Sequence, residues 1–163
     1  MSIIIFSKAI HSGKTTALIK YADDISSAQR VGGVLMPDVD GCRKLFNIET
    51  KEYFDVECRD SSVTTRSLVQ IGRFHFYADA FEKANAIILQ AASTVDLLII
   101  DEVGRLELEY KGFHQSVKEI LQLDEYKNGT KVVLLVVRDS LYEAVLSFFE
   151  IAKHRLVNKL SDI

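Results

Sequence analysis

The sequence predicts an α/β fold built on a doubly wound, mostly parallel sheet. Apolar, β-branched runs alternate with amphipathic helical segments, a Gly-Lys-Thr-Thr stretch follows the first run, and an Asp-Glu pair ends a later one. Alternating strands and helices are typical of parallel sheets whose crossover helices cover both faces. The chain of 163 residues has the length of one domain, so we expect a single domain over residues 1–163.

Hydrophobic periodicity assigns the individual elements. A buried strand is a short apolar run, whereas a surface helix places apolar residues on one face every three or four positions. On this basis we expect strands at residues 2–6, 31–36, 73–76, 95–100, 131–137 and 155–157. We expect helices at residues 14–25, 78–92, 113–123 and 141–149.

One stretch breaks the alternation of strands and helices. Two alternating runs, at residues 43–48 and 52–57, predict an antiparallel β-hairpin inserted at about residues 41–58. The polar residues that follow, 59–70, show no period, and we expect a mobile loop there.

Composition narrows the class of partner. A net charge of -3 gives no electrostatic argument for nucleic acid or for an anionic membrane surface. No run approaches the roughly 18 apolar residues of a membrane span, and residues 3–5 lack the basic flank of a signal peptide. Cys42 and Cys58 have neither metal-site spacing nor disulfide density, which favours reduced thiols. We therefore expect a cytoplasmic protein without a nucleic-acid or membrane partner, and the sequence names no protein partner.

The segment after the first strand has the composition of a phosphate-binding loop (P-loop). A β-branched run precedes it and a helix-forming segment follows, so the helix would aim free backbone N–H groups at an anion. Lys14 would neutralise the β- and γ-phosphates, and the Thr15 hydroxyl would be a ligand for Mg²⁺. Lys8 stands where the usual pattern has glycine. The candidate nucleotide-binding residues are Lys8, Ala9, Ile10, His11, Ser12, Gly13, Lys14, Thr15 and Thr16.

A second motif ends the apolar run at residues 97–100. Asp101 and Glu102 would lie at the carboxyl edge of the sheet, where open α/β sheets bind their ligands. Asp101 is the candidate acid for Mg²⁺, and Glu102 is placed to polarise a water for attack on the γ-phosphorus. An acidic pair alone is equally well explained as a solvated strand end. Together with the Gly-Lys-Thr stretch, in this order, it indicates a nucleoside-triphosphate site.

Two arginines are candidates for stabilising charge in the transition state. Arg138 follows the strand at 131–137, which in one subclass of P-loop proteins lies between the loop strand and the Asp-Glu strand, beside the γ-phosphate. Asp139 after it would also make a good helix N-cap. Arg105 either acts at the phosphates, with Glu107 orienting it or a Mg²⁺-bound water, or forms a surface turn with Glu107 as a charge pair.

These motifs together resemble the small nucleoside-triphosphatase family first described from thermophiles and also found in mammals, including a cancer-related member. Residues 101–108 resemble its DEIGxMEL signature, residues 31–37 its GFYTxEV strand, and residues 70–76 its RVGxYxV segment. The resemblance implies a RecA-like P-loop fold of the additional-strand type and Mg²⁺-dependent hydrolysis of ATP, GTP and other nucleoside triphosphates. It also implies that Lys14 and Thr15 bind phosphate and Mg²⁺, that Asp101 holds the metal, and that Glu102 is the base.

Two alternative functions fit the same residues. In a small-molecule kinase, Glu102 would deprotonate an acceptor hydroxyl in a pocket under the hairpin and the 59–70 loop. In a non-catalytic nucleotide-binding protein, the glycine-poor loop would bind the nucleotide without turnover. Acceptor-stimulated ADP production would indicate the kinase, and tight binding without turnover would indicate the non-catalytic protein.

Overall fold

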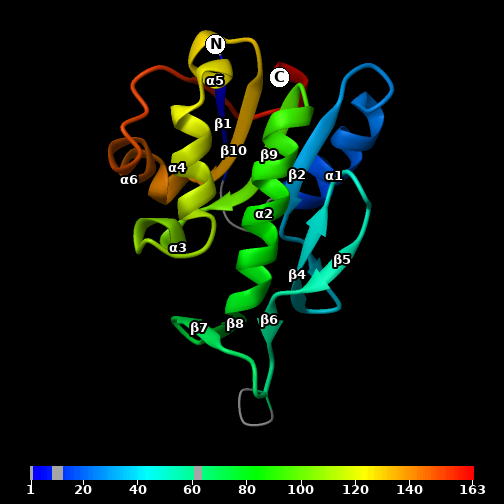
Figure 1. Cartoon of the computed structure of the whole chain (residues 1–163), viewed down its shortest axis with the longest axis vertical. Helices are drawn as coiled ribbons and strands as arrows, with labels where there is room; N and C mark the ends of the chain where they lie inside the picture. The colour runs from blue at the N-terminus through cyan, green and yellow to red at the C-terminus, as the bar shows by residue number, and fades with distance from the viewer. Residues whose placement is uncertain (1, 9–12, 61–63) are drawn as a thin grey trace.

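An eight-stranded, mostly parallel sheet forms the centre of the protein (Figure 1). The computed structural model describes residues 2–8, 13–60 and 64–163, apart from the side chains of Lys8, Lys14 and Ile71. The strands lie in the order β11 (Arg155–Val157), β1 (Ile3–Lys8), β10 (Val132–Arg138), β9 (Leu97–Val103), β2 (Val31–Leu35), β4 (Cys42–Asn47) and β3 (Asp38–Val39), with β5 (Tyr53–Asp55) paired to β4. The strands from β11 to β2 pair in parallel, whereas β4 pairs antiparallel with β2.

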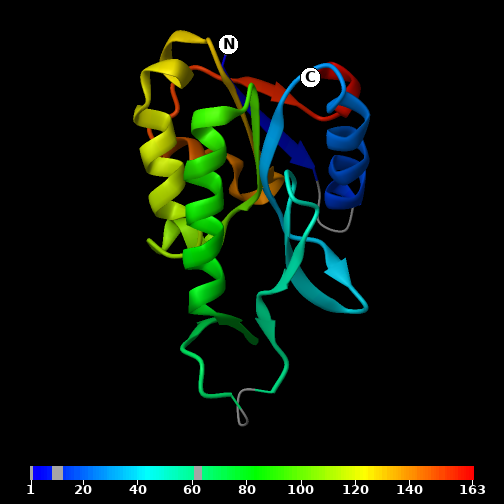
Figure 2. The ribbon, with the colours of Figure 1, turned by 45° about the vertical axis from the view of Figure 1, so that its right-hand side comes forward.

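Helices cover both faces of this sheet (Figure 2). α1 (Lys14–Ile25) lies on one side, while α2 (Ala78–Thr94), α4 (His114–Gln122) and α6 (Tyr142–Phe148) lie on the other. Side chains of β1 alternate between the two layers, because Ile4 and Phe6 pack with α1 whereas Ile5 packs with α2. Both faces are therefore apolar, which explains why the central strands are continuous hydrophobic runs. Among the described residues, no helix combines the length and apolarity that crossing a bilayer requires.

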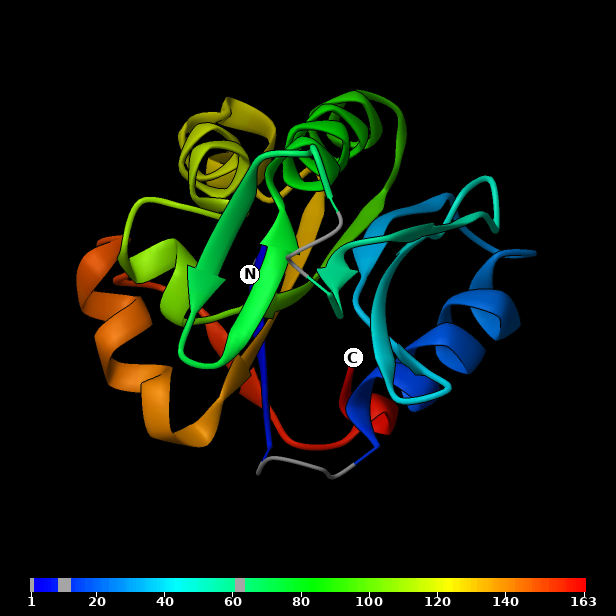
Figure 3. The same cartoon turned by 90° about the horizontal axis from the view of Figure 1, so that it is seen from below.

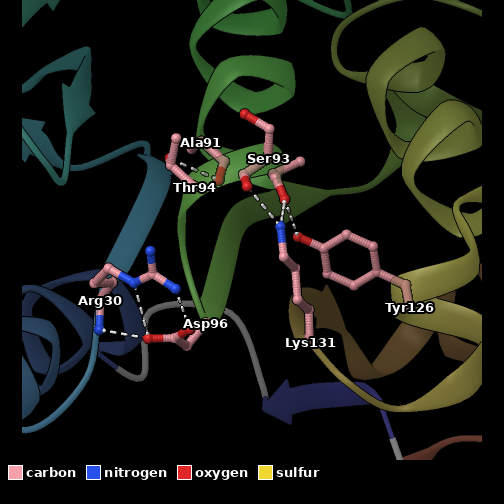
Figure 4. A network of polar contacts seen from close by, with 8 residues as sticks. Arg30, Ala91, Ser93, Thr94, Asp96, Tyr126 and Lys131 are labelled. Atoms are coloured by element: carbon pink, nitrogen blue, oxygen red, sulfur yellow. Dashed lines mark hydrogen bonds and ion pairs between the residues drawn. The ribbon is translucent and has the colours of Figure 1, made fainter.

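Polar contacts join helix and strand ends at the amino edge of the sheet, away from the predicted site (Figure 4). The side chain of Lys131 donates to the carbonyl oxygens of Ala92 and Ser93, at 2.7 and 2.8 Å, at the carboxyl end of α2. A cation at this end of a helix satisfies carbonyls that lack an intrahelical partner. Arg30 and Asp96 form an exposed ion pair of 2.8 Å beside it. The polar contacts at this edge therefore stabilise the fold.

Most of the predicted elements are present, with boundaries shifted by a few residues. The helix at 14–25 and the strand at 155–157 are confirmed at their predicted bounds, and β1 extends to Lys8 rather than ending at residue 6. The inserted hairpin is confirmed as β4 and β5, which pair antiparallel. Short helical turns were not predicted: α3 (Arg105–Leu108), α5 (Asp124–Asn128), η1 (Asp139–Leu141) and η2 (Leu160–Asp162). Elements of one turn are too short to develop a hydrophobic period.

The insertion is larger than the sequence predicts. The strand predicted at residues 73–76 is confirmed as β8 (Phe74–Tyr77), and it pairs with two strands that were not predicted separately, β6 (Glu57–Cys58) and β7 (Leu68–Ile71), to form a second sheet with β8 in the middle. The prediction of a mobile loop over residues 59–70 is wrong for its last three residues, which belong to β7. The polar composition of the stretch hid their alternation. Residues 61–63 lie outside the described part of the chain. Figure 3 shows the β7–β8 hairpin in front of the end of the central sheet.

The contact between β2 and β9 depends on Gly33. Its backbone has φ of +111°, and a Cβ atom there would overlap the carbonyl oxygen of Ile99 in β9. Glycine is needed on both grounds, because a side chain is disfavoured at this φ and the strands leave no room for one.

We therefore predict that Gly33→Ala lowers the free energy of unfolding by more than about 3 kcal/mol, since the clash is with backbone that cannot rotate away. Gly129→Ala is the matched control, because Gly129 also has positive φ (+83°) but has open space around it. It should cost only about 1 kcal/mol. Urea unfolding measures both, and equal losses would contradict the close approach of the two strands.

Candidate active site

Three strand ends meet at the carboxyl edge of the sheet. β1 and β10 run in parallel register, with Lys8 opposite Arg138, and β10 runs beside β9, with Val136 opposite Asp101. The interposed strand β10 was predicted between the loop strand and the Asp-Glu strand, and this order is observed. The sheet thereby brings the beginning of α1, the Asp-Glu pair and Arg138 to one edge.

The side chains of Thr15 and Asp101 contact each other at this edge. Thr15 lies in the first turn of α1, and its hydroxyl donates to Oδ2 of Asp101 at 2.6 Å. The backbone N–H of Met36, just after β2, points at the same oxygen from 3.4 Å. Asp101 is only 1% exposed. A buried carboxylate and a hydroxyl are the hard oxygen donors that Mg²⁺ prefers, so this pair fits one side of a magnesium site.

Within the predicted phosphate-binding stretch, the structure describes the backbone of Lys8 and the residues from Gly13 onward. Gly13 precedes the helix with φ of +71°, a left-handed conformation that favours glycine, and its carbonyl accepts from the N–H of Ala17 at 3.1 Å. Lys14 begins the helix and Thr16 is exposed, whereas Lys8 ends β1 in extended backbone. The predicted loop residues Ala9, Ile10, His11 and Ser12, and the side chains of Lys8 and Lys14, lie outside the described part of the chain.

Glu102 forms an ion pair with Arg138 across the ends of β9 and β10. The register between these strands shifts here, so that Val137 lies opposite Val103, and the Asp101–Glu102 peptide bond is cis. The two side chains are 19% and 28% exposed, respectively, and water therefore screens their attraction only partly. Two of the candidate catalytic residues, Glu102 and Arg138, thus contact each other, and Glu102 directly follows Asp101 of the Thr15–Asp101 pair.

Glu107 is buried, whereas the sequence suggested that it orients Arg105 or a Mg²⁺-bound water, or pairs with Arg105 in a surface turn. Its carboxylate is 1% exposed and accepts from the backbone N–H of Gly104 at 2.7 Å and of Phe113 at 2.8 Å. It therefore neither pairs with Arg105 nor forms a surface turn, but ties the segment after Glu102 to the start of α4. Burial raises the pKa of Glu107 to about 7, against the lowering effect of the two backbone donors. Arg105 begins α3 and is exposed.

Asp139 is not the helix N-cap that the sequence suggests. Its Oδ1 instead accepts from the hydroxyl of Ser7 at 2.6 Å, which joins the ends of β10 and β1. Ser7 is buried, with 5% exposure. This contact holds the strand that leads into the candidate phosphate-binding loop against the strand that carries Arg138. Only the parallel pairing of the two strands brings these residues together, so local sequence gave no signal for it.

A cavity of about 400 Å³ adjoins the ion pair. Glu102 and Arg138 line it from the main sheet, and the β7–β8 hairpin lines it from the insertion with Gly72, Arg73, Phe74 and Phe76. The remaining lining residues are Met36, Arg43, Gly104, Arg105, Leu106, Glu107 and Leu141. Sequence reasoning missed Arg43 and the aromatic residues, because they come from two different sheets, β4 of the main sheet and β8 of the smaller one, that converge only in the folded protein.

Comparison with known proteins agrees with this geometry. A family model described as NTPase matches residues 3–160, which is nearly the whole chain. The chain belongs to this NTPase family. The resemblance found in the Asp-Glu segment is therefore confirmed.

Archaeal proteins named nucleoside-triphosphatase THEP1 are among the relatives of this NTPase chain. The protein of Methanosarcina barkeri is 29% identical over 120 residues, which are 69% of this chain and 66% of that protein. The protein of Methanocaldococcus jannaschii is 22% identical over 157 residues, which are 83% of this chain and 89% of that protein. The match to the first of these spans slightly less than two thirds of its length.

Solved structures of similar fold are those of THEP1 from Aquifex aeolicus and of a human cancer-related nucleoside triphosphatase. The TM-scores are 0.69 and 0.70, at 21% and 17% identity, and both comparisons cover 97% of this chain. They cover 89% and 88% of the two solved chains. The predicted P-loop NTPase fold with its mostly parallel sheet is therefore confirmed. The roles of individual site residues stay predictions.

The buried position of Glu107 predicts a dependence of stability on pH. Because its folded-state pKa is raised to about 7, the native state keeps this proton where the unfolded state has lost it. Its contribution is complete below the ordinary carboxyl pKa and is lost as the pH rises through about 7. We expect this loss to be on the order of 3 kcal/mol.

Urea unfolding of wild type and of Glu107→Gln at several values between pH 4.5 and 8 measures this effect. Glutamine does not titrate, so the difference in unfolding free energy between the two proteins should shrink or reverse as the pH rises. Glu109→Gln is the control, because Glu109 is exposed in an ion pair with Lys111. A constant difference between wild type and Glu107→Gln across this range would rule out a buried group titrating near neutrality.

Proposed function

We propose that this protein is a Mg²⁺-dependent nucleoside triphosphatase that converts ATP, GTP and other nucleoside triphosphates to the diphosphate and phosphate. The proposal rests above all on one observation: the 2.6 Å contact between Thr15 and Asp101 lies beside the Glu102–Arg138 ion pair. Membership of the NTPase family supports a nucleoside triphosphate as the substrate.

The donor set supports magnesium as the cofactor. Thr15 and Asp101 would hold the ion, since both present oxygen atoms and no softer ligand is needed. Bound Mg²⁺ would supply positive charge that offsets the charge of the β- and γ-phosphates. The buried Asp101 carboxylate accepts a hydrogen bond from the Thr15 hydroxyl, which holds the two oxygen ligands close together.

The phosphates would be bound by residues 8–16 at the start of α1. The left-handed Gly13 leads into the helix, whose first backbone N–H groups have no acceptor within the helix, and these groups and the helix dipole would attract an anion. We assign to Lys14 the neutralisation of the β- and γ-phosphates. Lys8 supports this arrangement despite replacing a glycine, because it ends β1 in extended backbone that any residue adopts.

In the hydrolysis step, Glu102 would act as the general base. Its carboxylate accepts a proton from a water whose oxygen forms a bond to the γ-phosphorus, while the bond from that phosphorus to the bridging oxygen breaks. The nucleoside diphosphate leaves with the electron pair of the broken bond. Arg138, which pairs with Glu102 in the free protein, would turn to the γ-phosphate and stabilise its equatorial charge. Arg105 lines the same cavity and is a second cation within the site.

The two cysteines bear on where the enzyme is located. Cys42 and Cys58 are both free thiols, which supports a reducing, cytoplasmic location. A nucleoside triphosphate is the one partner that we propose. The chemistry of the site calls for neither nucleic acid nor a membrane.

We predict that Glu102→Gln lowers kcat for ATP and GTP at least about 100-fold, because the amide cannot accept the proton from water. Nucleotide affinity should change only a few-fold, since Glu102 would contact the attacking water and not the residues that bind the phosphates. Phosphate release at saturating Mg²⁺ and fluorescence binding of a nucleotide analogue measure the two effects.

Glu125→Gln is the matched control, because Glu125 lies in α5, which precedes the amino end of β10, and does not line the cavity. It should leave both quantities unchanged. If wild type releases no phosphate, or if Glu102→Gln releases it at the wild-type rate, the proposal of a hydrolase with this base is wrong. Tight nucleotide binding without turnover would indicate the non-catalytic alternative.

A further inference from the structure

The cavity beside Glu102 has room for more than the single water that would attack the γ-phosphorus. It has a volume of about 400 Å³, whereas one water occupies about 30 Å³ of liquid. Cavities from about 300 Å³ upward are the size that small organic ligands occupy in proteins. Glu102, the proposed base, lines it from the main sheet. The β7–β8 hairpin lines it with Gly72, Arg73, Phe74 and Phe76. The space therefore suits an organic molecule that reaches the reacting end of the nucleotide.

The charges around the cavity favour an anion. Arg43, Arg73 and Arg105 line it, and among the described residues no carboxylate lies within ion-pair distance of any of their guanidinium groups. The acidic residues of the lining are already engaged: Glu102 pairs with Arg138, and Glu107 accepts two backbone N–H groups. Arginine binds carboxylate and phosphate groups through paired hydrogen bonds. The lining thus offers cations without counterions.

The rest of the lining is apolar. Phe74 and Phe76 from β8 face the cavity together with Met36, Leu106 and Leu141. The rings of Phe74 and Phe76 stack at a centroid distance of 6.3 Å, which fixes this wall. Arg73 lies over the Phe74 ring, 5.0 Å from its centroid, so the wall holds the arginine in position. The arrangement combines an apolar surface for a carbon skeleton with cations for an acidic group.

We propose that this cavity binds a small organic anion that carries a hydroxyl group, and that this hydroxyl accepts the γ-phosphoryl group of the nucleotide. The inference rests on the proposed function, because it uses the same nucleotide and the same base. Glu102 takes the hydroxyl proton, the hydroxyl oxygen bonds to the γ-phosphorus, and the bond to the bridging oxygen breaks. The products are a phosphate ester and the nucleoside diphosphate, with one proton left on Glu102.

Hydrolysis and transfer would then be two outcomes at one site. With the cavity filled by solvent, water is the nucleophile, and the nucleotide is hydrolysed. With the anion bound, its apolar body displaces that water, and the hydroxyl held near Glu102 reacts instead. A bound acceptor should therefore suppress the release of free phosphate while total diphosphate production continues or rises.

Three probes of defined chemistry test the proposal: glycerate and 3-hydroxybenzoate as carboxylates, and glycerol 3-phosphate as a phosphate. Each is added at millimolar concentration to wild type with γ-labelled ATP and Mg²⁺. Binding is measured by calorimetry, and transfer is measured as labelled ester by mass spectrometry. Glycerol and 3-hydroxybenzamide are the neutral counterparts. We expect at least one anion to bind and to take up label, and its neutral counterpart to do neither.

Arginine variants localise the effect. Arg73→Ala should weaken binding of the active probe about tenfold and raise its KM by a similar factor, because one charge-assisted contact is lost. Arg59→Ala is the matched control: Arg59 lies on the same insertion, contacts the carbonyl of Asp40 and does not line the cavity. It should leave probe binding unchanged.

Three results would overturn the acceptor site: wild type hydrolyses ATP but binds and labels none of the anions, the neutral molecules react equally well, or Arg73→Ala binds the active probe like wild type. The first result leaves the proposed hydrolase standing. Absence of both nucleotide binding and phosphate release without any probe is a failure of the proposed function itself, so the two failures are distinguishable.

Discussion

The parallel register of β1, β10 and β9 is the constraint on which the site depends. Phe6 lies opposite Val136, and Val136 lies opposite Asp101, so one row of the sheet crosses all three strands just before they end. Alternating side chains on both faces bury these strands in two cores, and a slip of one residue would turn the side chains to the wrong layer. Packing in the two cores therefore fixes the positions of the Asp101 and Glu102 carboxylates relative to the start of α1.

The polar contacts at this edge divide into two kinds. Ser7 with Asp139, and Glu107 with two backbone N–H groups, hold segments of the chain together, and Ser7 and Glu107 are themselves buried. Thr15 with Asp101, and Glu102 with Arg138, are pairs of groups that a ligand would separate or bridge. We propose that contacts of the first kind hold the site in place and that groups of the second kind bind the ligand. The inserted sheet adds a third component, a cavity wall to which Gly72, Arg73, Phe74 and Phe76 contribute.

Local patterns in the sequence predicted the parts of the fold that have local causes. Gly13-Lys14-Thr15 identifies a strand-to-helix turn, and Asp101-Glu102 identifies the end of a buried strand, so the two motifs could be placed at one edge. The partners of Ser7 and Glu107 could not be predicted, because they follow from contacts between strands and turns distant in the sequence. Arg43 was missed for the same reason. The alternation Leu68–Ile71 was hidden by its polar surroundings, and β7 forms only because β8 pairs with it.

The central claim is that a metal and the γ-phosphate meet at this edge of the sheet. A crystal structure of the protein with Mn²⁺ in place of Mg²⁺ and a non-hydrolysable ATP analogue tests it most directly, because anomalous scattering locates the ion independently of the protein density. The account predicts an anomalous peak next to the Thr15 hydroxyl and Asp101, with the γ-phosphate facing Glu102 and Arg138. A peak elsewhere, or a nucleotide bound away from the start of α1, would contradict it.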